Sequence, residues 1–109
     1  MTDSLVAIQQ ECFEDSTAWF GGELVDNLAH QILALCGEVG ETANLLKKIQ
    51  RGSIQFDEES RGDLIEEMTD VFIYVVNIFN CLRANVGDSY DIKRSINADR
   101  FGGTSRPTL

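Results

Sequence analysis

Two long segments of this chain carry apolar residues at intervals of three and four, and this spacing constrains the fold more than any other feature. The first runs over about residues 23–51 and the second over about residues 57–86. Apolar residues at this spacing lie along one side of an α-helix. Gly52 and Gly87 follow the two segments, and glycine commonly ends a helix. The sequence therefore predicts two long helices that pair as an antiparallel hairpin.

Two shorter helices are expected to flank the hairpin. The first is expected to end before residues 16–22, which form a loop. The second begins at Asp88 or Ser89, either of which can cap a helix, and turns Ile92 and Ile96 inward. The predicted fold class is all-α, with a hairpin of two long helices and two shorter helices.

The chain is too short to cover all of its own apolar surface. It has 109 residues, of which 1–101 are expected to form a single domain and 102–109 a flexible tail. Residues 71–79 are apolar on nearly every side, and such a helix must be covered on every side. A domain of this size buries only about 60–65% of its unfolded surface. We therefore expect a homodimer or homotetramer that forms an oligomeric helix bundle.

The charge excludes several classes of partner. Eighteen acidic and nine basic residues give a net charge of −9, which repels nucleic acid and anionic membrane surfaces. The apolar blocks are shorter than a membrane span, and the N-terminus lacks a basic stretch followed by an apolar one. The three cysteines form no CxxC pair, which is typical of reduced thiols. The expected protein is cytoplasmic and binds neither nucleic acid nor membrane.

Two pairs of acids are the strongest candidates for a functional site. Glu38 and Glu41 are three residues apart on the first long helix, and Glu67 and Asp70 repeat this spacing on the second. Each pair therefore lies on one side of its helix, beside apolar positions. The simplest alternative is that these acids are solvated. If they face each other, a cation must offset their repulsion, and an all-oxygen site suits Mg²⁺, with Mn²⁺ as a possible substitute, better than Zn²⁺.

These residues resemble a known family. Residues 35–41 and then 67–71 are similar to the EExxE…ExxD signature of the MazG-like nucleoside triphosphate pyrophosphohydrolases, although Gly37 replaces the first Glu. The resemblance implies Mg²⁺-dependent hydrolysis of a nucleoside or deoxynucleoside triphosphate to monophosphate and pyrophosphate, in a dimer or tetramer. The family's metal ligands match Glu38, Glu41, Glu67 and Asp70. Either Glu38 or Glu41 could activate the attacking water.

Further residues are candidates for binding the substrate. The resemblance implies that Tyr74, Lys93 and Asn97 lie near the nucleotide. The other candidates are basic, aromatic or amide side chains expected beside the phosphates, base or sugar: Trp19, His30, Lys48, Asn77 and Arg100. Each also has a structural alternative, since basic residues near a helix C-terminus commonly interact with its dipole and a tryptophan commonly anchors a loop.

Two other functions compete with this hypothesis. A di-iron carboxylate protein also places acids on facing helices, but it requires ExxH motifs, and His30 is the only histidine. A non-enzymatic helical adaptor or oligomeric scaffold would use its apolar stripe to bind a partner helix and leave the acids solvated. Metal binding would distinguish the enzyme from the adaptor.

Overall fold

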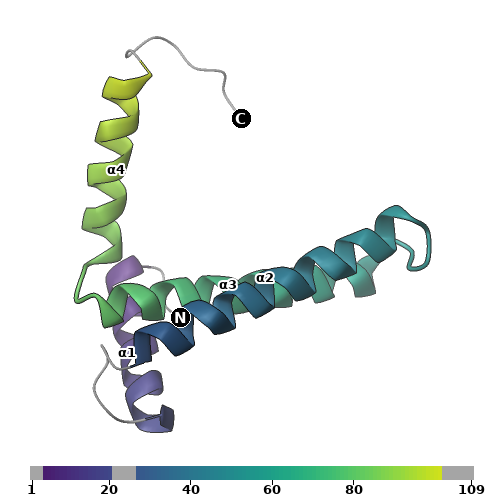
Figure 1. The fold of residues 1–109 in the computed structure, drawn as a ribbon, viewed down its shortest axis with the longest axis horizontal. Coiled ribbons are helices and arrows are strands. Elements are labelled where there is room, and N and C mark those ends of the chain that lie inside the picture. The colour runs from purple at the N-terminus through teal and green to yellow at the C-terminus, as the bar shows by residue number, and fades with distance from the viewer. Residues whose placement is uncertain (1–3, 21–26, 102–109) are drawn as a thin grey trace.

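The computed structural model describes residues 4–20 and 27–101, which form four helices and, within these ranges, no strand. The helices are α1 (Leu5–Phe20), α2 (Leu28–Gln50), α3 (Glu58–Cys81) and α4 (Val86–Arg100). Helices α2 and α3 run side by side as a long hairpin, α1 crosses its open end, and α4 extends away from it (Figure 1). The all-α prediction is confirmed. The start of the first long helix at residue 23 and the expected tail both lie outside the described residues.

Local signals specify the closed end of the hairpin. Helix α2 has two lysines in its last turn and is followed by Gly52, whose φ of 82° favours glycine. A capping box begins α3: the Ser60 N–H donates to Asp57 Oδ1 at 3.0 Å, and the Asp57 N–H donates to Ser60 Oγ at 2.9 Å. Both helix ends in this turn agree with the sequence prediction.

The junction between α3 and α4 differs from the prediction. The second long helix was expected to reach residue 86, but α3 ends at Cys81 and Arg83 adopts a positive φ of 54°. The expected caps, Asp88 and Ser89, are also wrong. Asn85 caps α4 instead, accepting a hydrogen bond from the Asp88 N–H at 2.9 Å. The break follows from this cap, because Asn85 supplies the acceptor that an α4 N–H group needs.

Helix α1 is longer than predicted. The expected loop at residues 16–22 is wrong for residues 16–20, which continue α1, whereas residues 21 and 22 lie outside the described part. No glycine or proline precedes Gly21 to stop the helix, and Ser16 is buried. Trp19 therefore lies on a helix rather than in a loop, with 71% of its surface exposed.

A glutamine on α1 ties this helix to the α3–α4 junction. Gln9 Nε2 donates to Asn80 Oδ1 at 2.9 Å and to the Ala84 carbonyl at 2.8 Å. Gln9 Oε1 accepts from the Val86 N–H at 2.9 Å. We call these three bonds the Gln9 clip. It satisfies backbone groups where α3 ends and α4 begins, so α1 helps to determine the direction in which α4 leaves the hairpin.

The single chain leaves much apolar surface uncovered. Among the described residues, the buried apolar side chains are Val76 and Cys81. Ile92 and Ile96 of α4 were expected to face inward, but they are 63% and 49% exposed because no other helix of this chain covers that side. No helix in the described ranges combines the length and apolar character needed to cross a membrane.

Candidate metal centre

Three carboxylates meet across the hairpin. Glu38 of α2 and Glu67 and Asp70 of α3 each place one oxygen so that the three atoms lie within 4.8 Å of one another. All three side chains are half-buried. The three-residue spacing on α3 places Glu67 and Asp70 on one side of that helix, and the antiparallel pairing brings Glu38 opposite them. We call this cluster the carboxylate trio.

The electrostatics of the trio are unfavourable without a cation. Glu38 Oε2 and Glu67 Oε2 are enclosed and have no hydrogen-bond partner. A hydrogen bond between the two carboxyls needs a proton on one of them, and this bond is the main reason that the pKa of Glu38 rises from 4.5 to about 7. Burial and the negative charges of Glu41, Glu67 and Asp70 raise this pKa further. The trio therefore favours either a bound proton or a bound cation.

Glu41 does not join the trio. It was predicted as a fourth metal ligand, but its side chain is exposed on α2 one turn beyond Glu38. It is still close enough for its charge to raise the pKa of Glu38. The structure thus brings together three of the four predicted ligands and places Glu41 beside them.

Two buried amides lie further along the same seam between α2 and α3. Asn77, a predicted binding residue, is 8% exposed, and Gln31 is 2% exposed. Gln31 Oε1 and Asn77 Oδ1 are enclosed without a hydrogen-bond partner. Tyr74, between Asp70 and Asn77 on α3, is half-buried. The sequence analysis missed Gln31, although its spacing of seven residues from Glu38 could have identified it, because residues seven apart lie on nearly the same side of a helix.

The predicted residues of α4 do not reach the trio of their own chain. Lys93, Asn97 and Arg100 lie on α4, which packs against α1 and extends away from the hairpin (Figure 1). Asp70 lies eleven residues before the end of α3, or about 16 Å along the helix axis. The Arg100 guanidinium lies over the Phe101 ring, 5.8 Å from its centroid.

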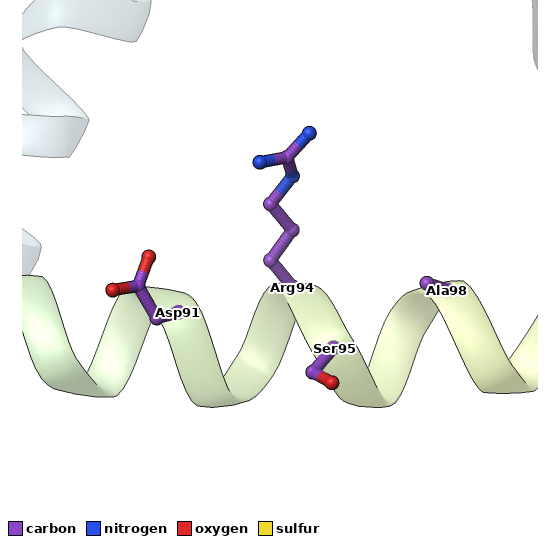
Figure 2. Close-up of a pocket in the computed structure, with 4 residues that line it drawn as sticks. All are labelled: Asp91, Arg94, Ser95 and Ala98. Carbon is purple, nitrogen blue, oxygen red and sulfur yellow. The ribbon is translucent and has the colours of Figure 1, made fainter.

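A shallow hollow on α4 is separate from the trio. Asp91, Arg94, Ser95 and Ala98 of this one helix line it, and Arg94 extends into open space (Figure 2). Because α2 and α3 contribute no lining residue, the hollow adds nothing to the carboxylate chemistry.

The remaining candidates are exposed and lie apart from the trio. Lys48 is in the last turn of α2, ten residues or about 15 Å beyond Glu38. His30 lies eight residues before Glu38, and Trp19 lies near the end of α1. None of these three side chains is part of the cluster that the structure brings together.

Comparison with known proteins relates the chain to a phage protein. No family model matches the chain. Over 81 residues it is 35% identical to the Gene 37 protein of Mycobacterium phage L5, and the alignment covers 71% of each chain. The chain belongs to the family of this phage protein. The name Gene 37 protein states no activity, so the chemistry must be argued from the site itself.

Proposed function

We propose that this protein is a Mg²⁺-dependent pyrophosphohydrolase that cleaves a nucleoside or deoxynucleoside triphosphate to monophosphate and pyrophosphate. The observation that carries the proposal is the carboxylate trio, in which Glu38 and Glu67 turn enclosed, unpartnered oxygens toward each other. The resemblance of the two acidic motifs to the MazG-like enzymes supports the same function.

The donors of the trio fit Mg²⁺. All three are carboxylates, with no nitrogen or sulfur among them, and hard oxygen ligands suit Mg²⁺ or Mn²⁺. Mg²⁺ is usually held by a few carboxylates and by substrate phosphates, and when bound it offsets the charge of those phosphates. A net charge of −9 gives the protein no other general means of attracting a triphosphate.

Glu41 is the better candidate for orienting the attacking water. Glu38 belongs to the trio, whereas Glu41 is exposed beside it and free of that cluster. A carboxylate that is not engaged by metal can accept a proton from water. Glu41→Gln should therefore lower kcat with little change in Mg²⁺ affinity, whereas Glu38→Gln should weaken Mg²⁺ binding itself.

We include assembly into a homodimer or homotetramer in this proposal. The chain has an accessible surface of 8218 Å², and a compact monomer of 12.1 kDa exposes about 6,000 Å². Its radius of gyration is 17.0 Å, against about 13 Å for a compact chain of this length. The uncovered apolar surface includes Ile65, Met68 and Phe72 on the outer side of α3. A second copy offers a partner for this side.

Assembly would also give the basic side of α4 a role. Lys93 and Arg100 extend away from the trio of their own chain, so in this proposal they serve a trio of another copy. Phosphate binding by lysine and arginine would then complement the metal.

A substrate panel tests the function. The purified protein is incubated with Mg²⁺ and each ribo- and deoxynucleoside triphosphate, and the release of monophosphate and pyrophosphate is measured. Glu67→Gln should abolish this activity and leave the fold intact, because it removes a ligand and relieves repulsion. Glu66→Gln, at the exposed neighbouring position, is the matched control and should retain activity. Full activity of Glu67→Gln, or release of orthophosphate instead of pyrophosphate, would refute the proposal.

The uncovered apolar side of α3 favours one other function, a helical adaptor that binds a partner helix. An adaptor has no use for the enclosed oxygens of Glu38 and Glu67. Titration with Mg²⁺ separates the two: stoichiometric binding that Glu38→Gln abolishes supports the enzyme, and its absence supports the adaptor.

A further inference from the structure

We propose that Gln31 and Asn77 read the nucleobase, and that they select a base with an exocyclic amino group over one with a carbonyl at that position. This inference rests on the proposed function, because it assumes that a triphosphate is held at the carboxylate trio. It assigns the base to a second set of side chains in the same hairpin.

The register of the hairpin places the two amides together. Glu38 faces Glu67 and Asp70 across the seam. In an antiparallel pair, moving seven residues back along α2 corresponds to moving seven forward along α3. Gln31 therefore faces the positions of Tyr74 and Asn77, as Glu38 faces the two acids. Seven residues correspond to about 10.5 Å along a helix and return nearly to the same side.

The unpartnered oxygens indicate that these amides need a partner that the chain itself does not supply. Gln31 is 2% exposed and Asn77 is 8% exposed, and the side-chain oxygen of each accepts no hydrogen bond. A buried acceptor without a donor destabilises the fold, so such atoms in native proteins normally serve a ligand or an ordered water. Both oxygens lie on the same side of the trio, in the direction of the open end of the hairpin.

The chemistry of the two acceptors limits what they can bind. Two converging amide oxygens need donors, and an exocyclic amino group on a base supplies two N–H donors. Uracil and thymine present carbonyl oxygens on either side of a single N–H, so an amide oxygen would meet a second acceptor. Leaving a buried polar group unpaired is the strongest basis for rejecting a near-identical ligand. The pair should therefore prefer cytosine to uracil, since these bases differ mainly at this position.

The test compares two ligands that differ mainly at this one position. Calorimetry with Mg²⁺ measures the binding of the α,β-imido analogues of CTP and UTP, in which the bond to be cleaved is replaced, and of inorganic triphosphate, which has no base. We expect the CTP analogue to bind about tenfold more tightly than the UTP analogue, from one or two hydrogen bonds worth about two- to tenfold each. Inorganic triphosphate should bind independently of the amides.

Variants assign the preference to the two side chains. Gln31→Met and Asn77→Leu keep the size of the side chain and remove the oxygen, so each should bring the CTP-to-UTP ratio close to one with unchanged affinity for inorganic triphosphate. Both should unfold at the same temperature as the wild type or higher, because an unpaired buried oxygen is lost. Asn44→Leu, at an exposed amide of α2, is the matched control and should keep the preference.

The outcomes separate this inference from the proposed function. If inorganic triphosphate and the nucleotides bind but the UTP analogue binds as well as or better than the CTP analogue, the amides do not read the base as proposed and the function stands. Equal preference in wild type and both variants has the same meaning. If no triphosphate binds with Mg²⁺, the proposed function itself fails, and the inference fails with it.

Discussion

The Gln9 clip provides the sharpest test of how the helices are held together. The side chain of Gln9 makes three hydrogen bonds, to Asn80, Ala84 and Val86, at 2.8–2.9 Å. These bonds connect residues more than seventy positions apart and end on backbone groups at the α3–α4 junction. Gln9→Ala removes all three and leaves one donor and two acceptors without their partner.

The size of the effect follows from the number of bonds. A hydrogen bond contributes about 0.5–1.5 kcal/mol net, so losing three should lower the free energy of unfolding by about 3 kcal/mol. For a domain of this size each kcal/mol lowers Tm by about 4–8 °C, so Tm should fall by about 12–24 °C. The bonds are only partly buried, so water can replace some of them, and the lower half of this range is expected.

The neighbouring glutamine is a matched control. Gln10 makes an exposed hydrogen bond to Glu14 one turn along α1, so Gln10→Ala should cost about 0.5 kcal/mol or less. Both variants replace glutamine with alanine in the same helix, so their helix propensities change equally. Urea and thermal unfolding, followed by circular dichroism, measure the difference. If the two variants differ by less than about 0.5 kcal/mol, the clip does not hold α1 to the junction.

Three further predictions concern pH, assembly and helix stability. In metal-free protein the free energy of unfolding should fall as pH rises from 4.5 to about 7, because the folded chain keeps on Glu38 a proton that the unfolded chain releases. Urea unfolding should show a smaller fall in Glu38→Gln, and parallel pH profiles of the two proteins would contradict the reasoning. Phe72→Asp should dissociate the wild-type oligomer in light scattering, whereas Phe56→Asp, at an exposed position in the α2–α3 turn, should not; a wild-type monomer would refute the assembly. Gly40→Ala should raise the free energy of unfolding by about 0.5–1 kcal/mol, because an added Cβ meets no atom within 4 Å. A decrease measured by urea unfolding would mean that this space is occupied.

Sequence alone determined those features whose causes are local. The three- and four-residue spacing of apolar side chains predicted the hairpin helices, and Gly52 predicted where the first of them ends. The spacing of Glu67 and Asp70 placed both on one side of α3, since helix geometry determines which residues share a side. Asn77 was likewise expected to lie in the interior of the hairpin, and it is buried.

Only the tertiary structure decided how these local units meet. Nothing local distinguishes Glu38 from Glu41, and it is the pairing of α2 with α3 that turns Glu38 into the trio and leaves Glu41 exposed. The direction of α4 depends on a hydrogen-bond clip from Gln9, more than seventy residues away in sequence. Gln31 was missed for the same reason, because burial in the seam is a property of two helices together. Periodicity is set by a single helix, whereas register, crossing direction and burial are set by contacts between residues far apart in the chain.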